Sequence, residues 1–235
     1  MKISSSKTAK DQDHVELCQQ SEDVVELDLS NKELSGDPCA IKVMSLLNKY
    51  QNLTILNLSR NRLHSSIWSE KIGTFLIFTN TLKSLDLSHN CLAHSTTWAN
   101  YLSKALKTNS SLQHLNLSYN EIGGTAWSEA VDDFTKVNTT LTDLDLSYNE
   151  IGGYEWTKTI IAIFKVNTTL QTLNLAHNEL EPYTLEKELS ENNLKKLNLE
   201  GNKGVSIAVD TINALTEYFI SLEQDTAFNT FHDIA

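Results

Sequence analysis

The chain has 235 residues, of which 40% are hydrophobic and 21% are charged, as in an ordinary globular protein with a packed core. Its formal net charge is −11, and only two of its 19 basic residues, Arg60 and Arg62, are arginines. Nucleic acids and anionic membranes are bound by clustered Lys and Arg side chains, and the sequence has no such cluster. We therefore expect neither as a partner.

Residues 1–23 are predicted to form an N-terminal tail and irregular cap. Residues 1–10 are polar and are expected to be disordered, whereas His14–Cys18 (HVELC) is expected to form an irregular edge strand. The N-terminus has no apolar segment of the kind found in signal peptides. The three cysteines are odd in number and have no CxxC spacing, which favours reduced thiols and a cytoplasmic location.

From Val24 onward the chain repeats one motif, L-x-x-L-x-L-x-x-N-x-L. Its copies begin at Val24, Leu53, Leu82, Leu112, Leu141, Leu170 and Leu194. The intervals are 29 or 30 residues, except the last, which is 24. A fixed period of this length is typical of a solenoid, in which each unit buries its apolar face by stacking on its neighbours.

The first half of each unit is predicted to be a short strand that ends in an asparagine turn. Leu144 and Leu146 alternate with polar residues, which indicates a strand with one buried face. The amide of the following Asn149 is suited to bonding backbone groups where the strand ends. The turn asparagines are Asn61, Asn90, Asn120, Asn149, Asn178 and Asn202, and the first copy has Lys32 instead.

The second half of each unit is predicted to be a helix, because apolar residues recur every three or four positions. The four tryptophans stand at one repeat position, and three of them come seven residues after the turn asparagine. The exception is Trp98, eight residues after Asn90, which places the extra residue of the 30-residue interval in this loop. The tryptophans are in phase with the aliphatic stripe, so we interpret them as core residues and not as a ligand platform.

Motif, period and helical returns resemble the leucine-rich repeat superfamily, in particular its ribonuclease-inhibitor-like branch, from Val24 to about Gly204. The resemblance implies an α/β solenoid: a curved right-handed β/α horseshoe segment of about seven repeats, with a parallel concave sheet and convex helices. Strands stack more closely than helices, which favours this curvature. The sequence departs from this branch at one position. The branch usually has a glycine just before each helix, and here that glycine is replaced by other residues. The residues found there are Ile67, Thr97, Ala126 and Glu155.

The repeat array is thus predicted to span residues 24–204. Thr184–Asn192 is expected to be the helix of the shortened last interval. Residues 205–222 are amphipathic and are expected to form a C-terminal capping helix, and residues 223–235 a flexible tail.

One column of outward-facing residues alternates between aspartate and asparagine, which we interpret as a hydrogen-bonded ladder. Its members are Asp28, Asn57, Asp86, Asn116, Asp145, Asn174 and Asn198. His114 and Asp143 are predicted to lie opposite each other on adjacent strands, with no serine or cysteine evidently placed beside them as a nucleophile. No metal-binding cluster and no Gly-rich phosphate loop is present in the sequence. We expect no cofactor and no enzyme, with a hydrolase using the concave Asp and His residues as the alternative.

The residue before each turn asparagine forms a second column of large side chains: Arg60, His89, Tyr119, Tyr148 and His177. Two interpretations stay open, partner binding through Tyr and Arg side chains or stacking along the ladder. Acidic residues follow two positions later, which suits a partner with a basic surface; they are Glu121, Glu150 and Glu179. The predicted protein-binding residues are Arg60, His89, His114, Tyr119, Asp143, Asp145, Tyr148 and His177.

We therefore expect a monomeric module that binds a partner protein through its concave face and the lip of that face. The alternative is an inhibitor that caps the active site of an enzyme, as the resemblance suggests. Short leucine-rich repeat chains also resemble effectors that intracellular bacterial pathogens inject into host cells. This resemblance implies a host protein as partner and a role for the C-terminal tail in translocation.

Overall fold

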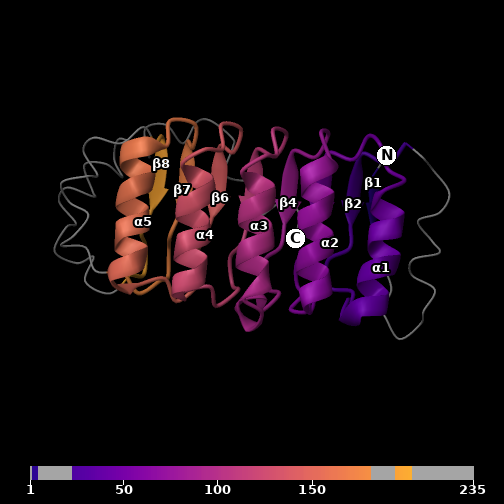
Figure 1. The fold of residues 1–235 in the computed structure, drawn as a ribbon, viewed down its shortest axis with the longest axis horizontal. Coiled ribbons are helices and arrows are strands. Elements are labelled where there is room, and N and C mark those ends of the chain that lie inside the picture. The colour runs from indigo at the N-terminus through magenta and orange to yellow at the C-terminus, as the bar shows by residue number, and fades with distance from the viewer. Residues whose placement is uncertain (1, 5–22, 181–193, 203–235) are drawn as a thin grey trace.

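The computed structural model describes residues 2–4, 23–180 and 194–202, and within them the chain forms one parallel sheet covered on one face by helices (Figure 1). The eight strands are hydrogen-bonded in sequence order. They are β1 (Lys2–Ser4), β2 (Glu26–Asp28), β3 (Ile55–Asn57), β4 (Ser84–Asp86), β5 (His114–Asn116), β6 (Asp143–Asp145), β7 (Thr172–Asn174) and β8 (Lys196–Asn198). Strands β2–β8 are the seven strands predicted from the repeats.

Every pair of neighbouring strands keeps the register of the repeat. In each strand from β2 to β8 the middle residue is a leucine, and each is in register with the next, as Leu115 is with Leu144. The leucines therefore form a continuous column beneath the sheet, and those of β2–β7 are buried. The residues on either side of each leucine face away from the helices.

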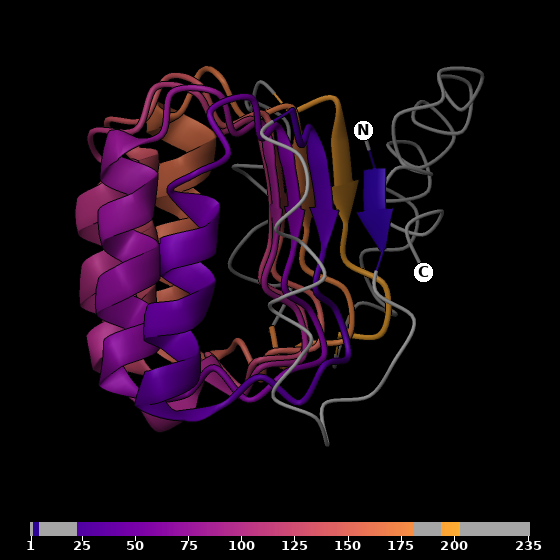
Figure 2. The same ribbon diagram turned by 90° about the vertical axis from the view of Figure 1, so that its right-hand side faces the viewer.

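The described helices follow strands β2–β6 one by one. They are α1 (Gly36–Leu47), α2 (Ser66–Phe78), α3 (Thr97–Leu106), α4 (Thr125–Thr135) and α5 (Gly153–Val166). Figure 2 shows that the first and last strands lie farther from the helix layer than the middle strands, so the free face of the sheet is concave. The predicted α/β repeat solenoid is confirmed.

The tryptophans lie in the core between helices and sheet, as predicted. Trp68 and Trp98 are fully buried, and Trp127 and Trp156 are at most 4% exposed. The helices begin one to three residues before each tryptophan. The position of the first helical residue therefore varies among the units. The extra residue of the 30-residue interval lies in a loop that contains a short 3₁₀ helix, η1 (Leu92–His94).

The N-terminal edge differs from the prediction. Residues 1–10 were expected to be disordered, but Lys2–Ser4 forms β1 and pairs in parallel with β2. The open edge of β2 has unpaired backbone groups, and β1 satisfies them. The predicted edge strand His14–Cys18, the helices over 184–192 and 205–222 and the tail 223–235 lie outside the described residues.

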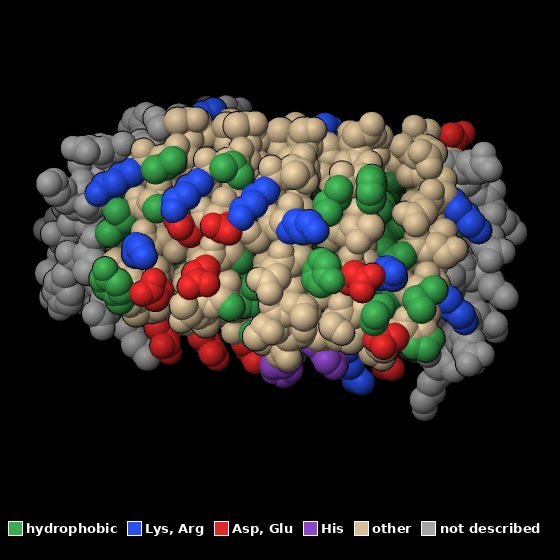
Figure 3. Space-filling view, viewed as in Figure 1, with side chains coloured by type: hydrophobic (Ala, Val, Ile, Leu, Met, Phe, Trp, Pro, Cys, Tyr) green, Lys and Arg blue, Asp and Glu red, His purple; other side chains and the backbone are tan. Residues whose placement is uncertain are grey.

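The outer face of the helices carries scattered side chains of every kind (Figure 3). Hydrophobic groups form separate patches among lysines and carboxylates, and the most exposed of them include Phe78 and Tyr154. Of the helices that the structure describes, none has the length and apolar character needed to cross a lipid bilayer.

Candidate protein-binding surface

The Asp/Asn column runs along the C-terminal ends of the strands on the concave face. In each unit the side-chain Oδ1 accepts a hydrogen bond from the backbone N–H two residues later, as Asn116 does from Ser118 at 2.9 Å. The same turn recurs from Asp28 to Asn198. The side chains of one neighbouring pair are also linked, because Asn174 Nδ2 donates to Asp145 Oδ2 at 3.0 Å. These contacts support the interpretation of the column as a hydrogen-bonded ladder.

The carboxylates of this column are held apart by asparagines. Burial, and then the negative charge of Asp145 two strands away, raise the pKa of Asp86, although hydrogen bonds from Ser88 and the charge of Arg60 act against this. An uninterrupted row of aspartates would place like charges about 4.8 Å apart. The alternation keeps the turn geometry and weakens the repulsion, because the nearest carboxylates are then two strands apart.

The turn asparagines lie directly beneath the lip and are almost fully buried. Asn120 Nδ2 donates to the carbonyl oxygens of Leu87 and Leu117, both at 3.0 Å. Asn120 Oδ1 accepts from the N–H of Asn90 at 2.8 Å, and the N–H of Asn120 donates in turn to Asn149 Oδ1 at 2.7 Å. Each asparagine thus joins its own unit to the preceding one, which fixes the spacing of the lip.

The side chains just before these asparagines form a stack that we term the ring column: His89, Tyr119, Tyr148 and His177. The ring centroids are 4.0, 4.1 and 4.2 Å apart along the column, and the planes are within 18° of parallel. All four residues have φ between 53° and 57°, the left-handed backbone region. That backbone turns each side chain outward at the same angle, so stacking along the ladder does occur.

Stacking leaves the edges of the rings open to solvent. Tyr119 and Tyr148 are 41% and 39% exposed, although their ring faces are covered by their neighbours. Burial, and then the hydrogen bond with the Tyr148 hydroxyl, raise the pKa of Tyr119, so its phenol is neutral at physiological pH. The two interpretations from sequence are therefore compatible, since a stacked column still presents ring edges and hydroxyl groups.

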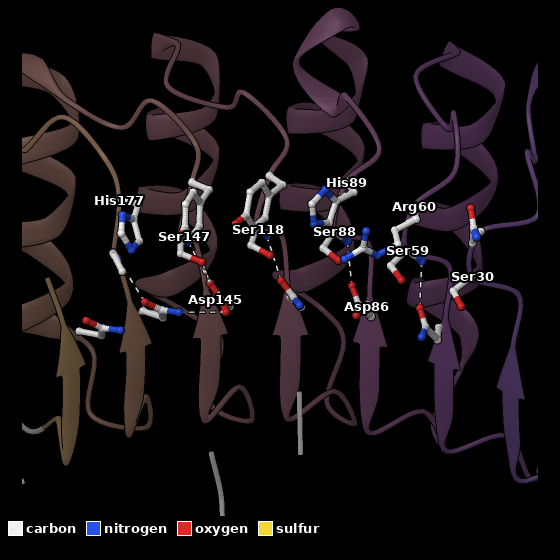
Figure 4. Close-up of a pocket in the computed structure, with 18 of the residues that line it drawn as sticks. Ser30, Ser59, Arg60, Asp86, Ser88, His89, Ser118, Asp145, Ser147 and His177 are labelled. Atoms are coloured by element: carbon white, nitrogen blue, oxygen red, sulfur yellow. Dashed lines mark hydrogen bonds between the residues drawn. The ribbon is translucent and has the colours of Figure 1, made fainter. Parts of the chain in front are cut away.

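Both ends of the ring column are defined. At the first end Arg60 stands one unit before His89 (Figure 4), and burial followed by the charge of Arg60 lowers the pKa of His89. At the other end the equivalent position is Gly201, which has φ of 72°. A Cβ atom there would lie only 2.3 Å from His177 Nδ1, so the column ends at His177.

The ring column borders a groove of about 700 Å³ on the concave face (Figure 4). The Asp/Asn column lines it from Asp28 to Asn198, and between that column and the lip runs a row of mostly serine side chains. Six of the predicted binding residues line this groove: Arg60, His89, Tyr119, Asp145, Tyr148 and His177.

The remaining two predicted residues lie at the other end of the strands, outside the groove. His114 and Asp143 are in register on β5 and β6, as predicted, and His114 Nδ1 is 2.9 Å from Asp143 Oδ2. Burial acts to raise the pKa of Asp143, but hydrogen bonds from His114, Thr142 and Thr172 together lower it. The pair therefore has the properties of a structural hydrogen-bonded contact.

The sequence-based search overlooked Ser84, which is in register with His114 on the opposite side from Asp143. Aligning the strands residue by residue would have found it. None of the three residues lines the concave groove. Within the described residues, no group of three or more His, Cys, Asp or Glu side chains is placed to hold a metal ion.

Comparisons with known proteins match the repeats. Two leucine-rich repeat family models match the chain, one over residues 52–74 and the other over 80–93, 108–126, 137–153 and 166–182. A search of curated proteins gave no match. Among matching solved structures is the leucine-rich repeat-containing protein LegL7 from Legionella pneumophila, 21% identical, with a TM-score of 0.61. The similarity covers 92% of this chain and 68% of LegL7. Repeats, solenoid and matches together show that this chain carries leucine-rich repeats and has the fold of a leucine-rich repeat solenoid.

Proposed function

We propose that this protein binds a partner protein through the concave groove and the ring column. Leucine-rich repeat proteins serve as protein-interaction modules, and this chain shares their fold and repeats. The observation that carries the proposal is the groove of about 700 Å³ bordered by exposed aromatic edges. Seven repeat strands span about 30 Å, which is wide enough for one face of a small protein.

The rigidity of the ring column favours binding. Tyrosine adds contact area and a hydroxyl while losing little conformational entropy, and here each ring is already fixed between two others. The turn asparagines hold the backbone beneath the column in place. The conformational entropy of these side chains is therefore lost when the protein folds, and not when a partner binds.

The test is a variant in which Tyr119, Tyr148 and His177 are replaced by alanine. A partner is first identified by affinity capture and mass spectrometry, and its dissociation constant is then measured with purified proteins. We expect at least tenfold weaker binding, because removal of interface tyrosines commonly costs more than about 1.4 kcal/mol. A matched control replaces Tyr154 and Phe78, which are 78% and 79% exposed on the helical face. Equal affinities for the triple variant and the wild type would refute the proposal.

The binding role also suits an effector injected into a host cell, and we propose a host protein as the partner on that basis. Support comes from the repeats and from the fold similarity to LegL7, a Legionella pneumophila protein. Deletion of residues 224–235 is expected to abolish translocation of a reporter fusion while the unfolding transition stays unchanged. Normal translocation of the truncated protein would exclude a role for this segment. The inhibitor alternative stays a prediction.

A further inference from the structure

The Asp/Asn column gives the concave groove a regular alternation of charge. From Asp28 to Asn174 its members alternate strictly between carboxylate and amide, and every one of them lines the groove. Among the described residues that line it, the only lysine or arginine is Arg60. The lining carboxylates belong to Asp28, Asp86, Asp145 and Glu200. The groove therefore favours a positively charged occupant.

Two buried asparagines of the column have an unused hydrogen-bond donor. Asn57 and Asn116 are 5% and 7% exposed, and in both the Oδ1 atom accepts the backbone N–H two residues later at 2.9 Å. Because an N–H group requires an acceptor, this bond fixes the amide orientation and turns Nδ2 away from the turn. Within the described residues neither Nδ2 donates a hydrogen bond, and both side chains line the groove. Polar groups this deeply buried are as a rule hydrogen-bonded, so the two amides require an acceptor that this part of the chain does not supply.

The carboxylates also keep acceptor capacity. Oδ1 of Asp28 accepts the N–H of Ser30 at 2.9 Å, and Oδ1 of Asp86 accepts that of Ser88 at 2.8 Å. A carboxylate accepts at two oxygens, so one N–H does not exhaust it. In the described part of the chain, neither Asp28 nor Asp86 forms an ion pair with a lysine or arginine. Burial, and then the charge of Asp145, raise the pKa of Asp86, so a cation bound between these two aspartates would relieve an existing repulsion.

The spacing of the carboxylates favours one conformation of the occupant. Asp28, Asp86 and Asp145 lie on β2, β4 and β6, so each is two strands from the next. Two strand spacings are about 9.6 Å. A polyproline II helix has about three residues per turn and a rise of about 3.1 Å per residue, so it presents a side chain on one face every ~9.3 Å. The two repeats therefore stay in step along the groove.

Other conformations match the spacing less well. In a β-strand the side chains of one face recur about every 6.7 Å, and the residue three positions on points the opposite way. In an α-helix, residues about seven apart share a face at about 10.5 Å, so the mismatch grows to about 2 Å between Asp28 and Asp145. Polyproline II ligands also dock in grooves lined by aromatic residues, and here Tyr119 and Tyr148 border the groove with exposed edges.

We propose that the concave groove receives a polyproline II segment of the partner protein with a lysine or arginine at every third residue. The cations pair with Asp28, Asp86 and Asp145. Backbone carbonyl groups between the cations accept hydrogen bonds from Asn57 and Asn116. The inference rests on the proposed function for its biological meaning, since the segment belongs to the partner. The site itself is testable with peptides.

The probe is an acetylated and amidated nonapeptide of three Pro-Pro-Arg units, titrated at low salt into ¹⁵N-labelled full-length protein. The control peptide has the same composition but carries its three arginines side by side, so that only one faces the groove. We expect saturable shifts of the backbone amides of Ser30, Ser88 and Ser118, which donate to the column. The spaced peptide should bind about fivefold more tightly than the control, as two additional ion pairs would give. Added salt should weaken its binding.

The variant D28N/D86N removes two of the three carboxylates. It keeps the turns, because asparagine makes the same backbone bond in the neighbouring units. It should bind the spaced peptide about fivefold more weakly than the wild type does and should no longer distinguish the two peptides. The matched control is E121Q, which should bind like the wild type. The Glu121 carboxylate is 3.3 Å from His94 Nε2 and does not line the groove.

No saturable shift, equal wild-type affinities for the two peptides, or full affinity in D28N/D86N would each overturn the inference. Tighter binding of a helical peptide with arginines seven residues apart would also overturn it, because the groove would then accept a helix. These outcomes leave the proposed function untouched, since that depends on the Tyr119, Tyr148 and His177 variant and an identified partner. Conversely, spacing-dependent peptide binding, together with a partner that binds that triple variant at full strength, would refute the proposed function alone.

Discussion

The turn-asparagine column and the ring column differ sharply although their members are neighbours in sequence. Asparagine occupies the first in all six units from β3 to β8, and its side chains are at most 7% exposed. The second column changes from arginine to histidine, tyrosine and glycine along the array, and its two tyrosines are about 40% exposed. One residue of separation thus divides a uniform column from a varied one.

The difference follows from what each side chain contacts. An asparagine at the turn bonds backbone groups of two units at once, and no other side chain has the same length with both donors and an acceptor. The rings of the ring column stack on one another, and the two tyrosines are partly exposed to solvent. The backbone therefore dictates the residue type in the first column and leaves the second column free to vary.

The largest expected effect is loss of stability in Asn120→Ala. This change leaves the Asn90 N–H and the Leu87 and Leu117 carbonyl groups without the bonds that Asn120 makes. We expect a loss of about 3 kcal/mol in the free energy of unfolding, measured by denaturant titration. The matched change one residue earlier, Tyr119→Ala, should cost about 1–2 kcal/mol through lost ring contacts. If Tyr119→Ala proved the more damaging of the two, the ring column would be a structural element first.

A second comparison concerns two tryptophans of the uniform core. Trp98 Nε1 donates to the carbonyl oxygen of Leu63 at 2.6 Å, whereas the buried Trp68 Nε1 has no partner among the described residues. Replacement by phenylalanine removes a hydrogen bond in the first case and an unsatisfied donor in the second. We expect Trp98→Phe to lower the free energy of unfolding by about 1 kcal/mol more than Trp68→Phe. Equal losses would show that packing alone determines the effect at this position.

Much of this fold was predictable from sequence because the repeat specifies it many times over. The leucine spacing gave the strands, the register and the concave face, and the phase of the tryptophans gave the core. The ring column and the His114–Asp143 pair were also predicted as neighbours, because residues at equivalent repeat positions lie side by side.

Other features had no signal in the repeat. The strand β1 lies outside the array, and its pairing depends on the open edge of β2 and not on the motif. The end of the ring column at His177 depends on the left-handed backbone at Gly201 and on how closely Gly201 approaches the His177 ring. Whether the four rings stack or point apart depends on the left-handed φ angle of each ring-column residue. A pattern of residue types does not reveal that angle.

A pH experiment examines the other end of the strands, where His114 and Asp143 pair. Hydrogen bonds hold the pKa of Asp143 below its ordinary value despite burial, so its ionised form stabilises the folded state. That contribution is fully present above the unfolded pKa of about 3.9 and is lost as pH falls through the lower folded pKa. Asp143→Asn should therefore be less stable than the wild type by about 1 kcal/mol at pH 7. The difference between the two unfolding free energies should shrink towards pH 3, and a constant difference would contradict this account.

The smallest expected effect is a gain in stability from Asp86→Asn. Burial and the charge of Asp145 raise the pKa of Asp86, so ionisation of this carboxyl opposes folding above its folded pKa. Asparagine already serves this position in the adjacent units, where Asn57 and Asn116 accept the same backbone hydrogen bond. The substitution keeps that bond and removes the repulsion, so we expect a gain of about 0.5 kcal/mol at pH 7 that disappears in acid. Since Asp86 also lines the groove, an unchanged dissociation constant for the partner would place recognition on the ring column, and a weaker one would extend the binding surface to the strands.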